Sequence, residues 1–429
     1  MKFRQANLTF LSFSCSILFT TNAFASNGFN GIGFGAESIG LGGADIAIAH
    51  DTSSLNTNPA GLAEIKQQWL DIYAAAVYGV DVQHRDNFGN DKEVDDRFVP
   101  VATLGYAHRL KDTRITFGVG AFAQGGTGYE YSNLNTAFGT RDDLTTQFRV
   151  AKVSGGVAYQ INDALQAGFS VSAIYSDLEQ KFFPETSFFN GQPENAFFGF
   201  RLKDVDGITY GYKIGVKYKV DNRQSIGFAF TPESDLKLNG GRLISNQSSI
   251  GLGKVTYRNA AVEGIKLPQE VGIGYAFEIT PQLLFAAKLN WLDWSSAMKK
   301  STLTFKNPQN PAAAPSVSES AKNDWRDQYV AAIGFAYQSS HQTVYRLGYN
   351  YGRNPIPNKH LNPLFATIMT QHFTAGFGKQ ITQGWHVDLG IEYSPNKKVS
   401  YTNPELPFGA NAQEENEIVV VHLTFSKVL

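Results

Sequence analysis

The sequence predicts an all-β protein: a transmembrane antiparallel β-barrel of about 14 strands, with an N-terminal hatch plugging the lumen. Three observations predict it. Only 17% of the 429 residues are charged, whereas 13% are aromatic and 41 are Gly; soluble domains carry about 25% charged residues. Beyond the extreme N-terminus no apolar run approaches the roughly 18 residues of a membrane helix. Segments of alternating polarity recur from about Leu70 to the end, as expected for strands that turn one face to lipid.

Residues 1–25 are predicted to be a signal peptide. Positive charge at Lys2 and Arg4 precedes an interrupted apolar stretch that ends in a small-x-small cleavage site. The single Cys15 leaves with this leader, so the mature chain would contain no disulfide. Export without a stop-transfer helix leaves the periplasm, the medium or the outer membrane as destinations.

The region 70–429 is predicted to be the barrel, and its strands are recognised by a period of two in polarity. In 212–220, for example, Tyr212 and Ile214 alternate with Lys213 and Lys217. A soluble sandwich would alternate likewise, so the pattern alone does not decide between the two folds. The fourteen predicted strands are 70–83, 98–110, 114–131, 145–161, 164–180, 206–220, 224–240, 266–279, 282–294, 325–338, 342–352, 368–380, 383–394 and 417–427.

The connections between these strands favour the barrel. Short polar turns, such as 162–163 and 280–281, alternate with long connections. The long ones are 84–97, 132–144, 181–205, 241–265, 295–324, 353–367 and 395–416. Transmembrane barrels show this asymmetry, with short periplasmic turns and long extracellular loops. An even strand count then predicts a bacterial outer-membrane protein with both termini in the periplasm.

The segment 26–69 lacks sustained alternation and is rich in glycine. Its Gly31-x-Gly33-x-x-Ala36 run superficially matches a dinucleotide fingerprint, but no strand precedes it and no parallel α/β pattern follows. We therefore expect no cofactor. Many glycines permit tight turns and close backbone approach, so the segment is predicted to be a compact hatch inside the barrel lumen.

Several motifs resemble one known family. Residues 40–44 and 47–51, followed by Asn58, Pro59, Ala60 and Gly61, resemble the N-terminal hatch of the FadL/TodX outer-membrane transporters. Stretches 267–271, 291–295, 345–349 and 354–357 also resemble that family. The resemblance implies a fourteen-stranded barrel with a plug. It also implies passive uptake of long-chain fatty acids or similar hydrophobic compounds, and no enzymatic activity.

The resemblance further implies lateral release of the substrate through a kinked third strand after the hatch moves. The matching residues are Gly125, Gly126 and Gly128. Glycines within a strand weaken the ladder and favour a bulge. The alternative is that the strand ends near Gln124 and these glycines begin a loop.

Family members also capture ligand among their extracellular loops. Three Phe pairs in the predicted loop 181–205 are candidates: Phe182, Phe183, Phe188, Phe189, Phe197 and Phe198. Exposed apolar clusters are unusual unless packed or functional, and self-packing of the loop is the alternative interpretation. Residues 361–369 are a second apolar loop candidate.

A fatty-acid carboxylate would require a cation in the lumen. Lys288 and Arg346 are candidates, since the alternation points them inward, as it does Lys152, Lys213 and Lys217. The alternative is that these cations pair with acidic side chains such as Glu270, Asp388 or Glu392.

The same residues bear on three other functions. A hydrolase is disfavoured because no Gly-x-Ser-x-Gly occurs, and the eight histidines lack metal-type spacing. A polar-solute porin and a loop-mediated adhesin or receptor stay open as alternatives. The expected partners are a hydrophobic small molecule and outer-membrane lipid with lipopolysaccharide. A net charge of −1 points to no nucleic acid, and a monomer is expected.

Overall fold

The computed structural model describes residues 27–192, 195–339, 342–407 and 411–429. The predicted leader, residues 1–25, lies outside the described residues. Within them, no helix has the length and apolar character needed to cross a membrane. The helical elements are α1 (Ala36–Gly40), η1 (Thr52–Leu55), η2 (Pro59–Glu64), η4 (Ser248–Ile250), α2 (Trp294–Ala297), η5 (Asn358–His360) and η6 (Pro363–Phe365).

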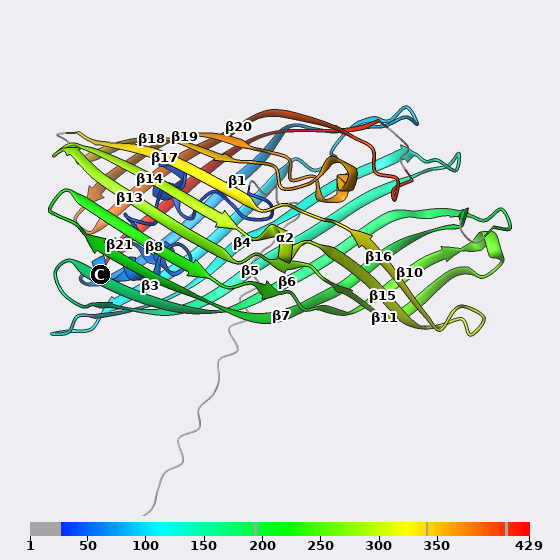
Figure 1. The fold of residues 1–429 in the computed structure, drawn as a ribbon, viewed down its shortest axis with the longest axis horizontal. Helices are drawn as coiled ribbons and strands as arrows, with labels where there is room; N and C mark the ends of the chain where they lie inside the picture. Colours follow the sequence, from blue (N-terminus) through cyan, green and yellow to red (C-terminus); the bar gives the residue numbers. More distant parts are fainter. Residues whose placement is uncertain (1–26, 193–194, 340–341, 408–410) are drawn as a thin grey trace, which may run out of the picture.

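The described strands form a closed antiparallel barrel of fourteen strands (Figure 1), which confirms the predicted fold class. In ring order they are β1 (Gln68–Arg85), β3 (Phe98–Arg109), β4 (Ile115–Asn135), β5 (Arg141–Gln160), β6 (Leu165–Phe188), β7 (Phe197–Lys219), β8 (Gln224–Thr231), β13 (Glu270–Thr280), β14 (Leu283–Leu292), β17 (Gln328–Gln338), β18 (Thr343–Gly352), β19 (Gln371–Thr382), β20 (Trp385–Tyr401) and β21 (Ala412–Val428). The last strand pairs with the first from Trp69–Val428 to Arg85–Gln413, so the wall closes on itself.

Seven further strands lie outside this ring order: β2 (Asp91–Glu93), β9 (Ser234–Asp235), β10 (Leu238–Gln247), β11 (Gly253–Glu263), β12 (Lys266–Leu267), β15 (Lys300–Pro308) and β16 (Ser316–Lys322). β10 pairs with β7, β11 with β10 and β15, and β15 with β16. The interpretation of 181–205, 241–265 and 295–324 as loops is therefore wrong. The sheet continues past the lipid-facing region, because neighbouring strands satisfy each other's backbone groups in water as well as in lipid.

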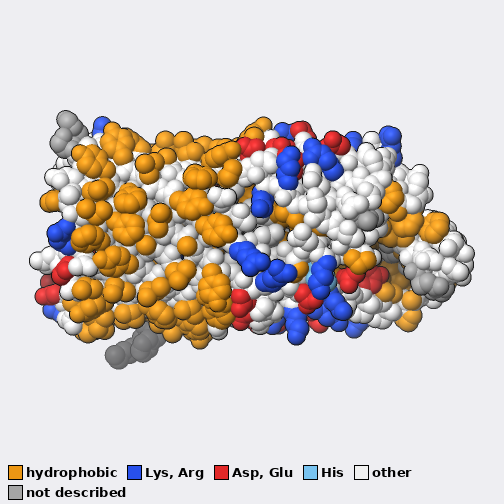
Figure 2. Space-filling view, turned by 45° about the horizontal axis from the view of Figure 1, so that its top comes forward, with side chains coloured by type: hydrophobic (Ala, Val, Ile, Leu, Met, Phe, Trp, Pro, Cys, Tyr) orange, Lys and Arg blue, Asp and Glu red, His pale blue; other side chains and the backbone are white. Residues whose placement is uncertain are grey.

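The two ends of the barrel differ. Short connections such as 281–282 and 383–384 lie at one end, here called the turn end, and the extended hairpins lie at the other, the loop end (Figure 1). An apolar belt covers the turn-end half of the outer surface, whereas charged side chains cover the loop-end half (Figure 2). Exposed belt residues include Ile72, Leu104, Val119, Val153, Phe169, Ile214, Ile273, Leu289, Ile333, Leu347, Ile391 and Val421.

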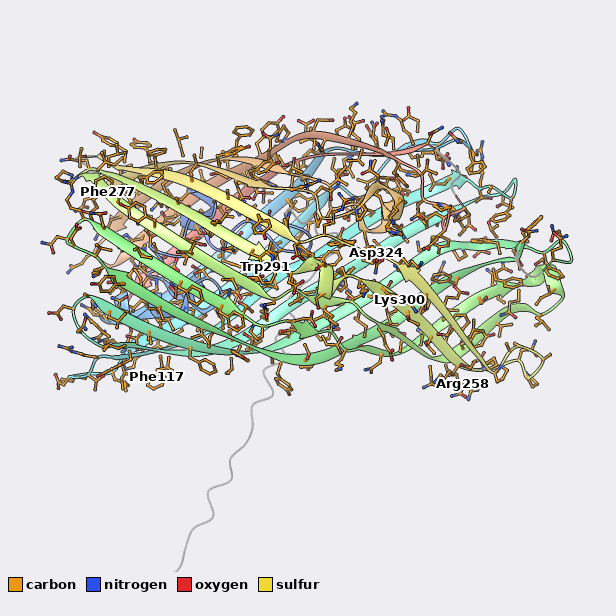
Figure 3. All side chains as sticks on the ribbon, in the orientation of Figure 1. Phe117, Arg258, Phe277, Trp291, Lys300 and Asp324 are labelled. Atoms are coloured by element: carbon orange, nitrogen blue, oxygen red, sulfur yellow. The ribbon has the colours of Figure 1, made fainter. Side chains whose placement is uncertain are left out.

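The labelled side chains follow the same division. Phe117 and Phe277 lie toward the turn end and Trp291 near the middle, whereas Lys300 and Arg258 lie in the loop-end half (Figure 3). Amphipathic rings suit the boundary between hydrocarbon and water. Only the turn-end half of the barrel thus offers a surface suited to a bilayer.

Residues 27–67 fold inside the barrel, with α1 against β18 to β21 and η2 against β4 to β7 (Figure 1). Wall glycines make this close approach possible. A Cβ on Gly168 would lie 2.2 Å from the carbonyl carbon of Pro59, and one on Gly348 would lie 2.1 Å from the amide nitrogen of Gly42. The inner wall therefore has room only for a hydrogen side chain at these points.

Candidate functional site

The Asn-Pro-Ala-Gly motif organises the hatch. The Asn58 side chain caps η2 by accepting a hydrogen bond from the Ala60 amide, 3.2 Å away. Its Nδ2 donates to the carbonyls of Ile46 (2.8 Å) in the hatch and Val216 (3.1 Å) in β7. A Cβ on Gly61 would lie 2.5 Å from the Ala49 carbonyl oxygen. The motif thus folds the hatch onto itself and attaches it to the wall.

Two of the predicted ligand cations bind the hatch. Lys288 Nζ on β14 lies 3.3 Å from Asp45 Oδ1. Arg346 on β18 lies 3.1 Å from Glu37 of α1 and 2.7 Å from Asp388 of β20. Both cations are buried. Their role in ligand binding stays a prediction, because hatch and wall carboxylates neutralise both in this arrangement.

A third ion pair holds the turn-end edge of the hatch. Lys217 Nζ on β7 lies 3.2 Å from Glu64 Oε1 and donates to the Ala49 carbonyl at 3.0 Å. Burial alone would raise the pKa of Glu64, but Lys217, Gln166 and Lys219 outweigh it and lower this pKa to about 2. Glu64 is therefore ionised across the physiological range.

The predicted kink in β4 is a β-bulge. The register with β5 shifts between Ala123 and Gly125, which leaves Gln124 without an opposite residue. Gly126 has φ +148°, a backbone region that favours glycine. A Cβ on Gly125 would lie 1.8 Å from the Phe29 carbonyl oxygen, which also accepts a hydrogen bond from the Gly126 amide at 3.1 Å. The bulge and the start of the hatch therefore fit against each other.

The strand continues beyond the bulge. β4 reaches Asn135, and Gly128 lies within it opposite Gln147 of β5. The alternative of a strand that ends near Gln124 is therefore excluded.

An opening in the wall lies beside the bulge. β3 and β4 pair only between Leu104–Arg109 and Thr116–Ala121. From 98 to 103, β3 pairs with β1 alone. Beyond Ala121, β4 pairs with β5 and, through one isolated bridge at Gly125, with Asn30 of the hatch. Near the loop end the gap closes again, where the amide of Asp95 donates to the Glu130 carbonyl at 2.8 Å. The result is a window between two otherwise adjacent strands.

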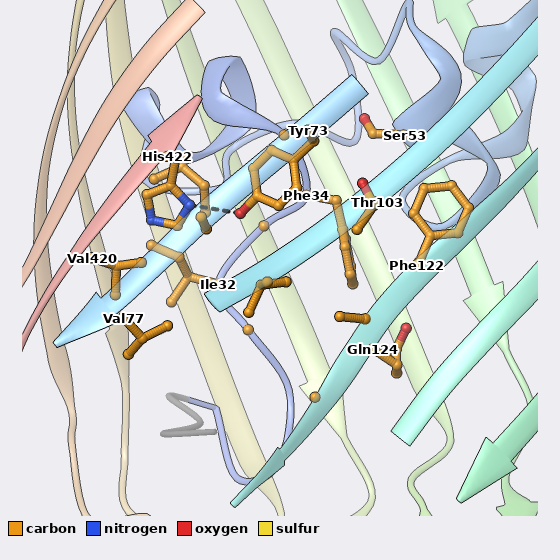
Figure 4. Close-up of a pocket in the computed structure, with 18 of the residues that line it drawn as sticks. Ile32, Phe34, Ser53, Tyr73, Val77, Thr103, Phe122, Gln124, Val420 and His422 are labelled. Atoms are coloured by element: carbon orange, nitrogen blue, oxygen red, sulfur yellow. Dashed lines mark hydrogen bonds between the residues drawn. The ribbon is translucent and has the colours of Figure 1, made fainter. Parts of the chain in front are cut away.

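Behind the window lies an apolar cavity of about 150 Å³, between the hatch and the wall (Figure 4). Leu104 of β3 and Val119 of β4, in the paired segments next to the window, are exposed on the belt. Its apolar lining comprises Ile32, Phe34 and Ile39 of the hatch and Tyr73, Ala75, Val77, Val99, Pro100, Val101, Phe122, Ala123, Val150 and Val420 of the wall. A hydrophobic molecule there would contact both the hatch and the edge of the window.

The polar lining of the cavity includes three carboxylates, those of Asp51, Asp71 and Glu392, together with Arg149 and His422. Asp71 of β1 accepts four hydrogen bonds: from the amide (3.0 Å) and hydroxyl (2.5 Å) of Thr52, Trp69 Nε1 (2.7 Å) and the Ser426 hydroxyl (2.5 Å). Asp71 thus contributes negative charge to the cavity and ties η1 of the hatch to two wall strands.

Asp51 of the hatch is the second acidic group. Its Oδ1 accepts from the amide (2.9 Å) and hydroxyl (2.5 Å) of Ser53. Burial, and then the charge of Asp71, raise the pKa of Asp51 to about 7. Asp51 lines both this cavity and a polar cavity at the turn end, so it stands at the boundary between the two.

Glu392 completes the polar lining. Its carboxylate lies 2.9 Å from His372 Nδ1 and 3.5 Å from His422 Nε2, and His422 Nδ1 lies 2.7 Å from the Tyr73 hydroxyl (Figure 4). These side chains come from β1, β19, β20 and β21. No motif marks these residues; the usable signal is that Tyr73 and His422 occupy inward positions of the first and last strands.

An aromatic cluster surrounds Phe29, whose backbone carbonyl contacts the bulge glycines at the edge of the cavity. The ring of Phe29 lies 5.1 Å from Phe148, 5.6 Å from Trp294, 5.0 Å from Trp325 and 5.9 Å from Phe365. The cluster thus lies beside the bulge, and none of its rings lines the cavity.

The segment 361–369 folds inward beside this cluster. Leu361, Ile368 and Met369 are buried, and the Ala366 carbonyl accepts from Tyr129 Oη and Asn416 Nδ2, both at 2.7 Å. The segment is a loop between β18 and β19 that contains η6, and its role in capture stays a prediction. Its apolar residues fill the lumen above the cavity.

The predicted capture residues lie farther toward the loop end and are Phe182, Phe183 and Phe188 of β6, Phe189 after it, and Phe197 and Phe198 of β7. Phe183 is buried, whereas Phe188 and Phe189 are exposed. The Phe182 ring lies 5.6 Å from Phe183 and 6.0 Å from Phe197. The six thus pack partly on one another, and none of them lines the cavity. Their role in capture stays a prediction.

Comparisons with known proteins agree on one family. The model of the outer membrane protein transport protein family (OMPP1/FadL/TodX) matches residues 17–426. A long-chain fatty acid transport protein of Escherichia coli is 20% identical over 414 residues, 89% of each chain. The Pseudomonas putida toluene transporter TodX has a TM-score of 0.76 at 19% identity, over 93% of this chain and 99% of that one. A Pseudomonas aeruginosa FadL homologue has a TM-score of 0.74 at 16% identity, over 94% and 99%.

Proposed function

Because the chain belongs to the OMPP1/FadL/TodX family of outer-membrane transport proteins, we propose that it mediates passive uptake of long-chain fatty acids or similar hydrophobic compounds. The similar proteins include one described as a long-chain fatty acid transporter and one as a toluene transporter. Both termini lie in the periplasm in this proposal, so the loop end faces the medium. The family comprises transport proteins and not enzymes.

The route begins at the loop end, where Phe188 and Phe189 offer exposed apolar surface. The substrate then passes the Phe29 cluster and enters the apolar cavity. Each buried CH₂ group contributes about 0.8 kcal/mol, so capture is favourable for even a short alkyl chain. The same free energy opposes release into water, which is why a hydrocarbon exit is preferable to an aqueous one.

Release occurs sideways through the window between β3 and β4. The single observation that carries this step is that the interrupted β3–β4 ladder opens onto the apolar cavity beside belt residues. A substrate that leaves there would stay in apolar surroundings throughout. Because Phe29 contacts the bulge glycines, displacement of the start of the hatch would free both the cavity entrance and the window.

The polar-solute porin is the less favoured alternative. Residues 27–67 occupy the lumen and are held there by three ion pairs to the wall. A porin requires an open aqueous lumen.

Deletion of Gln124 tests the lateral exit. Removing the unopposed residue eliminates the bulge, so β4 can continue in register beside β3 and close the window. Cells that carry this variant should take up radiolabelled oleate and toluene at least tenfold more slowly than wild type.

Gln124→Ala is the matched control. It loses the side-chain bonds to Asn30 and Asn56 but keeps the bulge, so its uptake should stay near wild type. Equal uptake by the deletion variant and wild type would refute the lateral exit. High conductance for sugars in planar bilayers, with no uptake of any apolar compound, would favour the porin instead.

A further inference from the structure

We propose that an exposed basic patch beside the apolar belt binds the phosphate groups of lipopolysaccharide in the outer leaflet. The basic patch comprises Lys299, Lys300, Lys322, Arg326 and Lys359, all of which are exposed. The site requires the loop end to face the medium, as in the proposed function. No step of the transport route uses it, so it is a separate site on the outer surface.

The centre of the basic patch is the outer face of the hairpin β15–β16. Lys300 of β15 lies directly opposite Lys322 of β16. Side chains alternate along a strand, and Phe305, five residues after Lys300, is buried in the hydrophobic cluster of the lumen, so both lysines face outward. The amide of Asn323 donates to the Lys299 carbonyl at 3.1 Å, which keeps Lys299 beside this pair.

Two further cations flank the hairpin. Arg326 is exposed, although its neighbour Trp325 is buried. His360 Nε2 lies 3.2 Å from Asp324 Oδ2, and this contact brings Lys359 of η5 next to the segment that follows β16. The basic patch is therefore built from parts of the chain that only the fold brings together.

The protein leaves the charge of the basic patch unneutralised. Within the residues that the structure describes, none of its five cations has a carboxylate at ion-pair distance. Many other cations of the loop-end half do have one: Arg85, Arg97, Lys181, Lys237, Arg242, Lys254, Lys266 and Lys398. Like charges directly opposite on neighbouring strands destabilise the pairing, so a bound anion would relieve the repulsion between Lys300 and Lys322.

The carboxylates near the basic patch do not change this balance. Glu319 of β16 alternates to the opposite face from Lys322, and Asp324 lies beside His360. Glu263 of β11 lies opposite Thr302 of β15, so it limits the basic patch on the side of β11.

The basic patch lies close to the apolar belt. Lys and Arg side chains gather directly beyond the edge of the belt (Figure 2). Trp291 lies near the middle of the barrel, and Lys300 lies beyond it toward the loop end (Figure 3). Trp291 Nε1 donates to Asp327 Oδ2 at 3.1 Å, and Tyr329 is 63% exposed; such rings are typical of the boundary between hydrocarbon and headgroups. Cations just beyond this boundary are placed to bind anionic lipid headgroups.

Lipopolysaccharide fits this arrangement better than a free anion does. It carries phosphates above its acyl chains, so the belt would contact the chains while the basic patch binds the phosphates. Thr302 and Ser320 lie on the same face as the two lysines, and their hydroxyls are 3.0 Å apart, so they can donate to phosphate or sugar oxygens. The guanidinium of Arg326 can bind a phosphate through two parallel hydrogen bonds.

Protection of a strand edge is the alternative role for these lysines. β16 pairs only with β15 within the described residues, and lysines on an edge strand hinder pairing with other chains. That role accounts for Lys322. It does not account for Arg326 and Lys359, which lie outside the strand.

The test uses the full-length protein, purified free of lipid in neutral detergent, and fluorescently labelled lipopolysaccharide. The variant combines Lys300→Gln, Lys322→Gln and Arg326→Gln. Because each cation near a lipid headgroup adds to the affinity, this triple variant should bind at least about tenfold more weakly than wild type in fluorescence anisotropy.

The matched control removes the same number of charges elsewhere in the loop-end half, as Lys237→Gln, Arg242→Gln and Lys254→Gln together. These three cations are also exposed, but each is paired with a carboxylate. The affinity of the control for lipopolysaccharide should therefore change less than about twofold. Equal affinity of the triple variant and wild type would overturn the proposal.

Wild-type protein offers a second measurement if the triple variant does not fold. Dephosphorylated lipopolysaccharide should bind at least about tenfold more weakly than the native form, and added salt should weaken the binding of the native form. Inorganic phosphate should compete only at far higher concentrations, since it lacks acyl chains. Equal binding of the two forms would overturn the proposal. Competition by inorganic phosphate at the concentration of the lipid would also overturn it, because the site would then bind the free anion.

Uptake measurements distinguish a failed lipid site from a failed transport function. If the triple variant binds lipopolysaccharide as wild type does, while deletion of Gln124 still blocks uptake of oleate, the lipid site fails and transport stands. If the gene changes the uptake of no apolar compound, while the triple variant loses lipopolysaccharide binding, the proposed function fails and the lipid site stands.

Discussion

The hatch meets two different kinds of wall. On one side β7, β14 and β18 hold it through buried ion pairs of Lys217, Lys288 and Arg346. On the other side β3 and β4 meet it across an apolar cavity, and their own ladder is interrupted. The difference suggests a division of roles: charged contacts fix the position of the hatch, while the apolar side supplies the part of the wall that can open.

The largest expected effect lies on the charged side. Arg346→Met would remove the cation shared by Glu37 and Asp388, which are both partly buried, and would leave Glu37 with His50, 3.4 Å away. Breaking a buried ion pair by removing one partner costs about 3–5 kcal/mol. The thermal unfolding midpoint in detergent should fall and proteolysis of the hatch should become faster.

Arg353→Met, the same substitution at an exposed position of the next connection, serves as the control and should leave both measurements unchanged. If Arg346→Met behaves like this control, the charged side does not fix the hatch and the comparison fails.

The two sides of the hatch also differ in how much of their structure could be predicted from the sequence. Polarity alternation predicted the fourteen strands, and the motifs between 40 and 62 predicted a family that the family match confirms. The glycines near 125 predicted an irregular strand. The window could not be predicted, because it depends on where β3 stops pairing with β4. The sequence of either strand alone does not show which of its residues pair with the neighbouring strand.

The acidic cavity was missed for a similar reason. Asp71 and Ser426 are distant in the chain and become neighbours only when β21 closes the ring against β1. The loop prediction for 181–205 failed because strand pairing continues beyond the apolar belt, where alternation no longer marks it. Polarity alternation in the sequence thus shows well which segments face lipid, but it does not show how strands that are distant in the chain pair with each other.

A somewhat smaller effect is expected from pH at the turn-end anchor. The pKa of Glu64 is about 2 in the folded protein against an ordinary value of 4.5. The ionised pair with Lys217 therefore stabilises the fold fully above pH 4.5, and this contribution, about 3 kcal/mol, is lost as the pH falls through 2.

Glu64→Gln isolates this contribution from the other carboxylates. Wild type should be more stable than the variant at pH 7, and the difference should shrink steadily below pH 5. Chemical unfolding midpoints measured at several pH values report it. A constant difference from pH 7 to pH 2 would show that the ion pair contributes nothing.

The hatch motif offers a further, smaller test. Asn58→Ala removes the cap of η2 and two hydrogen bonds to the carbonyls of Ile46 and Val216. The loss of a cap typically costs about 1 kcal/mol, and the carbonyls left without a donor add to it, so we expect about 1–2 kcal/mol. Hydrogen exchange at the amide of Ala60 should accelerate, while Asn58→Asp, which keeps the cap but not the donors, should protect that amide. Equal exchange in the two variants would contradict this assignment.

The smallest effect is expected where a charge pair lies far from the hatch. Arg242 on β10 lies 3.0 Å from Asp204 on β7, at the loop end, and both side chains are exposed. Exposed pairs contribute about 0.2–1 kcal/mol, because water and salt screen them and two long side chains must be ordered. Arg242→Ala should therefore shift the unfolding midpoint hardly at all, and uptake should not change. If Arg242→Ala lowered the unfolding midpoint as much as Arg346→Met, an exposed ion pair would contribute as much stability as a buried one. The buried pairs beside the hatch could then no longer be assigned the role of fixing its position.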